Sequence, residues 1–456
     1  MGMKQRVVIA GSGVAAVEAV LALRHLAGAG VELELLAPAH ALEDRPASVA
    51  TAFGLVAPAP LDLHDLARQY AVDLVTGELA AVDVGAATVE LVSGETRPYG
   101  HLLVAVGARA EPAVEGALTF TGPRDVPMLS WVLDEVRRGH RSQVVVAAPR
   151  GTTWPLPAYE LAIMAHSQLR SAPEATVALV TAERAPLWIF GEEAGAALQN
   201  VLAARGITLY TGAGAAHLTD DVLWLESGEA VMADTVVSLP RMRGPAIPGL
   251  PHDEQGFIPT DAHGYVLGAE RVLAAGDATT FPIKQGGLAT QQADAAAAAV
   301  AQDLGAPVEA RPFVPVLRGL LLTGGAPLYL RAELDAHGRR RAGRARRLRG
   351  EVSSRALWWP PGKVAGRYLA PYLSTARPVP LSSEPLVDRT AGAGAVDEAE
   401  HEAALELALL LAEEDEAAGD LPLALHALDA AAALGGGVLP AGFAERRERW
   451  LAQLKT

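Results

Sequence analysis

The chain has 456 residues, half of them apolar, so it is long enough to bury the cores of two or three domains. Its formal net charge of −15 argues against a protein that is built throughout to bind nucleic acid. It contains no cysteine, which excludes disulfides, thiolate metal sites and thiol-based redox relays.

The N-terminal segment has the order strand, glycine turn and helix. Residues 6–10 are a short apolar run that predicts a buried parallel strand, and helical periodicity follows from residue 14. Gly11 allows a tight turn, Gly13 lets the backbone approach a pyrophosphate, and the small Ala16 lets helix and strand pack closely. We therefore predict a dinucleotide whose phosphates face the positive end of this helix. The candidate cofactor-binding residues here are Gly11, Ser12, Gly13, Ala15 and Ala16.

The second strand, predicted over residues 31–38, lacks the usual ribose-binding acid. A dinucleotide site normally has Asp or Glu about 20 residues beyond the glycine loop. Glu34 lies inside the strand, where its side chain is placed to point the wrong way, so backbone contacts to the ribose stay an open alternative. Residues 99–112 contain another buried strand followed by a turn, in which Ala105 and Gly107 are candidate cofactor-binding residues.

A second unit of strand, loop and helix follows over residues 141–169, so a second Rossmann-like domain is predicted. Its loop, residues 149–157, keeps a single glycine and contains Trp154 and prolines, which lack the N–H groups that a pyrophosphate needs. NAD(P)H is therefore kept only as an alternative cofactor.

Residues 265–303 place a strand, the pair Gly276-Asp277, a loop and a long alanine-rich helix in order. Lys284 stands in the loop before the helix, in a chain with only four lysines among its 38 basic residues. Its alternatives are a cofactor or substrate role and an ordinary surface lysine. The candidate residues at the helix start are Lys284, Gln285, Gly286, Gly287 and Leu288.

Four of these segments together carry a family resemblance: the loop at residues 11–16, the turn at 105–109, residues 274–279 and the helix start at 284–294. Over roughly residues 5–375 the chain resembles the FAD-dependent pyridine nucleotide-disulfide oxidoreductase superfamily, and within it the branch of sulfide:quinone oxidoreductases and type II NADH dehydrogenases. The resemblance implies an α/β fold with two Rossmann-like, three-layer ββα dinucleotide-binding domains, a C-terminal capping region and an α-helical extension.

The resemblance also implies residue roles. Asp277 would hydrogen-bond the ribityl or phosphate part of FAD, and the pair Arg45-Pro46 would pack along the adenosine or pyrophosphate. Backbone N–H groups at residues 286–288 would stabilise the negative charge of the reduced flavin at its pyrimidine edge. Glu160 matches a family glutamate near the flavin and is a candidate proton relay; the alternative is an acid that complements a helix dipole.

The expected domain order places one domain inside another. We predict an FAD-binding domain in two parts, residues 1–118 and 243–310, around a divergent NAD(P)-binding-like domain at 119–242. A capping or interface region follows at 311–390, and a helical extension at 395–456.

The capping region concentrates aromatic residues around Lys363, which is the third catalytic candidate beside Glu160 and Lys284. Packing against the flavin domain is one interpretation, and a wall of the flavin pocket or a quinone entry surface is the other. The aromatic residues concerned are Trp358, Trp359, Tyr368 and Tyr372.

Two segments suggest partners. Residues 337–350 contain seven arginines, typical of a solvated loop or of contact with a membrane surface or an anionic partner. The acidic helices expected after residue 395 suit docking on their own subunit or on a protein partner, and a homodimer is a further option. We expect a cytoplasmic protein, with peripheral contact to the inner face of the membrane as the alternative, and no nucleic acid partner.

The function that these features favour is an oxidoreductase with FAD as its redox centre, which passes electrons from an unidentified small-molecule reductant to a quinone or another diffusible acceptor. The alternatives are an NAD(P)H dehydrogenase with a divergent nucleotide loop, and a flavin-binding scaffold or sensor with a partner-binding helical tail. No spacing of histidines and carboxylates predicts a metal site, and no Ser/His/Asp grouping predicts hydrolysis.

Overall fold

The computed structural model describes residues 6–42, 45–55, 60–341 and 351–376. Beyond residue 400 it describes only 409, 412–413, 416, 424–425, 428, 439–440 and 442–453, which include helix α11 (Phe443–Gln453). The arginine-rich segment from residue 342 onward and most of the predicted helical extension therefore lie outside the described residues.

The first domain is built on a parallel sheet whose strands come from both ends of the domain. The strand order is β20-β9-β1-β2-β5, and every neighbouring pair is parallel. The central strands are buried, which explains their continuous apolar runs. The strands are β1 (Arg6–Ala10), β2 (Glu32–Ala37), β5 (Asp73–Thr76), β9 (His101–Val104) and β20 (Val272–Ala274).

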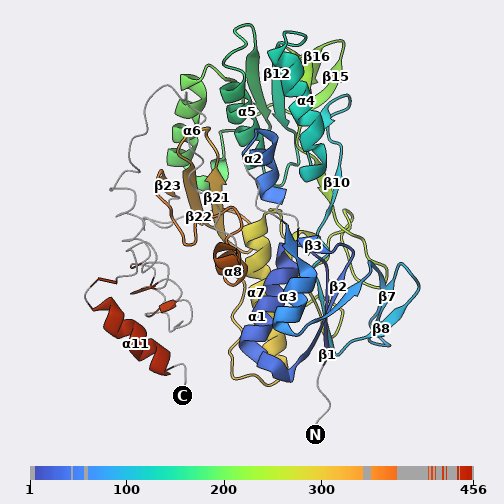
Figure 1. Cartoon of the computed structure of the whole chain (residues 1–456). Helices are drawn as coiled ribbons and strands as arrows, with labels where there is room; N and C mark the ends of the chain where they lie inside the picture. The colour runs from blue at the N-terminus through green and yellow to red at the C-terminus, as the bar shows by residue number, and fades with distance from the viewer. Residues whose placement is uncertain are drawn as a thin grey trace.

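Two helices, α1 (Val14–Ala27) and α7 (Gly286–Asp303), cover one face of this sheet and run side by side (Figure 1). Both helices contribute alanines to one core cluster, among them Ala16, Ala19 and Ala293, which are fully buried. Small side chains let the two backbones approach closely. Because α1 follows β1 and α7 follows β20, this packing joins the N-terminal and the later cofactor segments.

The other face of the sheet carries an antiparallel layer of β6 (Leu79–Asp83), β7 (Thr88–Leu91) and β8 (Thr96–Pro98). The layers are therefore ββα, as predicted. Shorter elements complete the domain: β3 (Ala41–Leu42), α2 (Ser48–Ala52), β4 (Leu61–Asp62) and α3 (Leu63–Tyr70).

The middle domain repeats the three layers. Its parallel sheet has the order β11-β18-β12-β13-β14, with helices against one face and an antiparallel sheet against the other (Figure 1). The sheet strands are β11 (Leu118–Thr119), β12 (Gln143–Ala148), β13 (Thr176–Thr181), β14 (Thr208–Tyr210) and β18 (Thr235–Ser238). The covering elements are α4 (Val126–Arg137), α5 (Leu156–Gln168), α6 (Glu192–Ala204), β15 (Ala215–Thr219), β16 (Val222–Leu225) and β17 (Ala230–Met232).

The two connections between the domains pair with each other. β10 (Arg109–Glu111) leaves the first domain and β19 (Arg241–Arg243) returns to it, and the two strands are antiparallel. The predicted α/β class with two Rossmann-like, three-layer domains is confirmed. The exact domain boundaries stay predictions.

The capping region adds an antiparallel sheet of β21 (Val316–Leu321), β22 (Leu328–Glu333) and β23 (Glu351–Ser353), which packs against α5 and α6 (Figure 1). Helix α8 (Leu369–Ala376) then lies on α1. In the part of the chain that the structure describes, no helix has the length and apolar character needed to cross a membrane.

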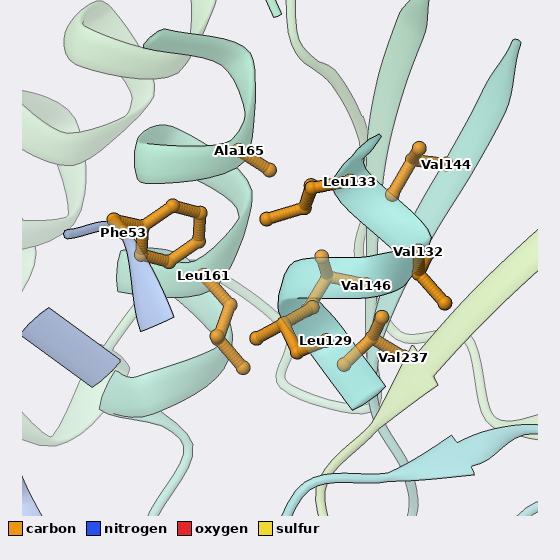
Figure 2. A pocket seen from close by; sticks show the side chains of 9 residues that line it. All are labelled: Phe53, Leu129, Val132, Leu133, Val144, Val146, Leu161, Ala165 and Val237. Atoms are coloured by element: carbon orange, nitrogen blue, oxygen red, sulfur yellow. The ribbon is translucent and has the colours of Figure 1, made fainter. Parts of the chain in front are cut away.

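A hollow of about 10 Å³ lies in the core of the middle domain, between α4, α5 and the sheet. Figure 2 shows the side chains that line it. Its walls are entirely apolar, and a cavity needs roughly 10–15 Å³ and polar partners to hold a water molecule. The hollow is therefore a small packing gap and no binding site. It is lined by Phe53, Leu129, Val132, Leu133, Val144, Val146, Leu161, Ala165 and Val237.

A buried pair of carboxyl groups attaches α8 to the first domain. Glu18 of α1 is fully buried and accepts the backbone N–H groups of Tyr368 and Leu369, each at 2.7 Å. Asp294 of α7 hydrogen-bonds the same carboxyl group. Burial raises the pKa of Glu18 from its ordinary 4.5 to about 7. Burial, and then the charge of Glu18, also raise the pKa of Asp294, whereas the charge of Arg367 lowers it. Burial and mutual repulsion thus disfavour a second negative charge on the pair.

This pair predicts a pH-dependent stability. A carboxyl group whose pKa is raised on folding contributes stability at pH values below its ordinary pKa. This contribution is lost as the pH rises through the pKa that the group has in the folded state. The thermal midpoint of the native chain should fall between about pH 5 and pH 8, because a second negative charge then develops in a buried site. Asp294→Asn should flatten that fall, as measured by thermal unfolding across this range.

The matched control is Asp73→Asn, which changes an exposed acid on β5. This variant should follow the native pH profile. An Asp294→Asn profile as steep as that of the native chain would contradict the coupling of the two carboxyl groups.

Candidate functional site

A single cavity of about 870 Å³ lies where the two Rossmann-like domains and the capping sheet meet. This volume lies in the range of about 300–1,000 Å³ that is typical of cofactor and small-molecule sites. Its walls combine the starts of α1 and α7, the turn after β9, the loop before α5 and the strand β21. The segments that were singled out from the sequence therefore meet at one place.

The start of α1 opens into this cavity. Gly11 has a φ of +139°, and a Cβ there would lie 2.2 Å from the carbonyl oxygen of Ala105, so only glycine fits. Gly13 precedes the helix, and a Cβ added to it would meet nothing within 4 Å. No side chain caps the helix. The first N–H groups of α1 are thus presented to the cavity in the manner of an anion site.

Most of the predicted cofactor-binding residues line the cavity. They are Gly11, Ser12, Gly13, Ala15, Arg45, Pro46, Ala105, Gly107, Gly276, Asp277, Lys284, Gln285 and Gly286. The structure places three others behind the wall: Ala16, Gly287 and Leu288. Ala16 packs helix against strand, which is the role expected of it.

Leu288 differs from the expectation that its N–H group faces a flavin. The Oε1 atom of Gln285 accepts this N–H group at 2.9 Å and so caps the start of α7. The Nε2 atom of Gln285 donates to the carbonyl oxygen of Arg318 at 3.1 Å. The helix start is thus already partly satisfied by its own side chain, and Gly286 remains at the cavity wall.

Asp277 and Lys284 form the floor of the cavity between β20 and α7. Within the described residues the Asp277 carboxylate accepts no hydrogen bond, and burial raises its pKa while Lys284 and Arg45 oppose the shift. Lys284 is only 7% exposed and is therefore no surface lysine. Its Nζ atom donates to the carbonyl oxygens of Thr279 and, at 2.7 Å, of Phe281. Burial lowers the pKa of Lys284 to about 8, against the attraction of Asp277 and Asp253.

Glu160 and Lys363 meet at the cavity wall although 203 residues separate them. The Nζ atom of Lys363 lies 2.7 Å from both carboxylate oxygens of Glu160, and the backbone N–H of Leu322 donates to Oε1 at 2.8 Å. Burial raises the pKa of Glu160, and the ammonium of Lys363 opposes this shift. Glu160 is therefore a buried, paired carboxylate and does not merely complement the dipole of α5.

The aromatic residues around Lys363 do not line the cavity. Trp358 packs edge-on against Tyr329 at 5.2 Å and donates to the carbonyl oxygen of Gly362. Tyr372 packs against Tyr70. These contacts favour the interpretation as structural packing over that as a pocket wall.

Several charged residues that line the cavity had no signal in the sequence, among them Glu78, which follows β5 and is exposed, and Arg318 of β21. Glu34, the acid nearest in sequence to the expected ribose position, is instead buried in β2 beside Arg6 and Arg97. A polar residue after a strand, or a single arginine within a strand, is too common in protein sequences to indicate a binding site.

The loop before α5 forms a wall of the cavity. Trp154, Leu156 and Pro157 line it, and proline stands at the N-cap and again within the first turn of α5. These prolines carry no N–H group. Farther along, the Tyr159 hydroxyl donates to Glu183 at 2.7 Å, just after β13. This carboxylate, placed where a Rossmann unit usually binds a ribose, is already engaged.

Comparison with known families decides the assignment. The model of a family described as "Pyridine nucleotide-disulphide oxidoreductase" matches residues 5–302. The chain belongs to this family. It is therefore an oxidoreductase and a flavoprotein by family, in agreement with the resemblance drawn from the sequence. No curated protein sequence matches the chain.

Solved structures share the fold of this oxidoreductase. The sulfide:quinone oxidoreductase of the hyperthermophilic bacterium Aquifex aeolicus is 18% identical, with a TM-score of 0.67 over 76% of this chain and 86% of that one. A ferredoxin reductase from Rhodopseudomonas palustris is 19% identical, with a TM-score of 0.56 over 72% and 83% of the two chains. An NAD-dependent persulfide reductase from A. fulgidus is 17% identical, with a TM-score of 0.56 over 73% and 64%.

Because Glu160 and Lys363 form a buried ion pair, we expect the variant Lys363→Met to lose stability, and to lose more of it at high pH. Removing one partner of a buried ion pair leaves an uncompensated charge and costs about 3–5 kcal/mol. Without Lys363 only the N–H group of Leu322 opposes the effect of burial on Glu160, so the pKa of Glu160 rises further and stability falls as the pH rises through it. The loss should be large at about pH 8 and smaller at about pH 5, as measured by urea unfolding.

Two controls separate charge from shape. Lys363→Arg keeps a cation, so its free energy of unfolding should fall less than that of Lys363→Met. The double variant Glu160→Gln/Lys363→Met should regain most of the lost stability, because no buried charge remains. Equal stability of Lys363→Met and the native chain at both pH values would show that the pair has no energetic role.

Proposed function

We propose that this oxidoreductase uses FAD as its redox centre and passes two electrons from a small-molecule reductant to a quinone or another diffusible acceptor, without redox cysteines. The observation that carries the proposal is the continuity of the 870 Å³ cavity, which extends from the start of α1 to the Glu160–Lys363 pair. It joins an anion-binding helix start to a buried acid within one site.

The residues present suit FAD. The uncapped start of α1, with space beyond Gly13, suits the pyrophosphate, and the cation of Arg45 lines the same cavity. The Asp277 carboxylate, which no described side chain or backbone group satisfies, is available for a hydroxyl group of the ribityl chain. Glu78 is available for the ribose in place of the missing acid at the end of β2. FAD supplies, when bound, a centre that accepts and returns two electrons.

Glu160 and Lys363 supply proton chemistry at the other end of the cavity. A quinone that accepts two electrons also takes up two protons to become a hydroquinone. Glu160 has a raised pKa because it is buried, and Lys363 holds its carboxylate at the cavity wall. We infer that Glu160 holds and releases a proton during turnover, with Lys363 as its positioning residue.

We propose a reductant other than NAD(P)H. The prolines at the start of α5 remove N–H groups from the place where a second pyrophosphate would rest, and Trp154 occupies the loop. Glu183, which would receive a ribose, is bonded by Tyr159. The absence of cysteine excludes reductants that need a thiol or disulfide relay.

The first prediction from this proposal concerns Gly13→Val. The position has an ordinary backbone conformation, and a Cβ would meet nothing within 4 Å, so the variant should fold. Its side chain would project where the phosphates are expected, so purified protein should lose most of its bound flavin, measured from visible absorbance per chain. The matched control is Gly30→Val, at a site away from the cavity that is equally open, which should keep its flavin.

A Gly13→Val protein that folds and retains a full complement of flavin would contradict the phosphate site. A folded native chain without flavin would contradict the proposal as a whole.

The second prediction concerns the reductant. Anaerobic mixing of the flavin-loaded protein with NADH or NADPH should leave the flavin absorbance unchanged over seconds, because the middle domain lacks a nucleotide cradle. A photochemically reduced sample mixed with a soluble quinone should reoxidise rapidly. Fast bleaching by either nucleotide would instead favour an NAD(P)H dehydrogenase.

A further inference from the structure

Arg318 is a cation at the cavity wall to which no described residue supplies an acidic partner. It lies on β21, and its carbonyl oxygen accepts Gln285 at the start of α7. Its guanidinium group makes no hydrogen bond or ion pair with any residue that the structure describes. The cavity is thus the place where this group meets a partner.

The sheet register explains why Arg318 faces the cavity. Successive side chains of a strand point to opposite faces. Leu317 and Leu321 are fully buried in the core that includes α5, whereas Arg318 and Leu320 lie on the other face and line the cavity. The direction of the side chain is therefore set by the apolar residues on either side of it.

The acids near this strand serve another arginine. Arg331 lies directly across from Arg318 on β22, and Glu351 lies across from Arg331 on β23. Arg331 also contacts Glu333 at 3.5 Å. Arg318 thus has a like charge as its cross-strand neighbour, and burial followed by Arg331 lowers its pKa to about 10. It remains a cation at neutral pH.

Lys284 and Lys363, which also line the cavity, are compensated. Lys363 is held by both carboxylate oxygens of Glu160. Lys284 donates to backbone carbonyl groups and is attracted by Asp277. An unpaired buried charge is costly, and a guanidinium group is suited to bind a planar carboxylate through two parallel hydrogen bonds. None of the described residues supplies this partner, so a bound carboxylate is suited to take its place.

We propose that Arg318 binds the carboxylate of an organic-acid substrate in the flavin-binding cavity. This inference rests on the proposed function, because it names the class of substrate for that site. Trp154, Leu156 and Leu320 line the same cavity and suit the carbon skeleton of such an acid.

The test measures binding of benzoate, a planar carboxylate, to the purified full-length protein by isothermal titration calorimetry, with or without bound flavin. Benzamide, which has the same shape without the charge, is the ligand control. The native chain should bind benzoate more tightly than benzamide. Arg318→Gln should weaken the binding of benzoate by about tenfold or more and leave the binding of benzamide unchanged. Arg318→Lys, which keeps a positive charge, should restore part of the lost benzoate affinity.

Arg331→Gln is the matched protein control. It removes a neighbouring arginine of the same sheet that does not line the cavity, so benzoate should bind it at least as well as the native chain. Equal benzoate binding by Arg318→Gln and the native chain would overturn the inference. If Arg318→Gln also lost its flavin while benzoate binding stayed unchanged, the flavin itself would be the partner of Arg318.

The two proposals fail separately. Visible absorbance reports on the flavin, and calorimetry reports on Arg318. A colourless protein that binds benzoate through Arg318 would reject the FAD proposal alone, and a yellow protein whose benzoate binding ignores Arg318 would reject this inference alone.

Discussion

The close packing of α1 against α7 is the constraint on which the site depends. Alanines on both helices let the two backbones approach, and their starts then open into the same cavity. A larger side chain at Ala16 or Ala293 would have no room in this fully buried cluster and would disturb the packing that positions both helix starts. The alanine-rich composition of this region is thus a geometric requirement, because it brings together segments that the middle domain separates in the sequence.

Charge is distributed unevenly along the cavity. The uncapped start of α1 and Arg45 line one part of it, and the buried Glu160–Lys363 ion pair lines another. The guanidinium group of Arg318 also lines the cavity and is paired with no residue that the structure describes. Buried charges without partners are expensive, so their persistence favours a functional role over a structural one. The absence of cysteine in the chain leaves these side chains, and the cofactor that they fit, to carry the chemistry of a family named for disulfides.

The fold could be predicted to a large extent, since apolar strands and glycine turns are local signals. The cavity wall was predictable where a backbone role demands a residue type, as at Gly11, where a Cβ would meet the carbonyl oxygen of Ala105. The link between Glu160 and Lys363 could not be foreseen, because a buried acid needs a partner but does not reveal which distant cation supplies it. Arg318 was missed because the face of a strand that becomes a cavity wall depends on tertiary packing. The capping of Leu288 by Gln285 likewise depends on a side-chain conformation that composition does not reveal.

The central claim is that one FAD molecule occupies the cavity between the two helix starts. The most direct measurement is the amount and identity of the cofactor released by denaturing the purified full-length protein, determined by mass spectrometry after reconstitution with excess FAD. The account predicts one FAD per chain. A folded protein that carries no flavin and takes up none would contradict it.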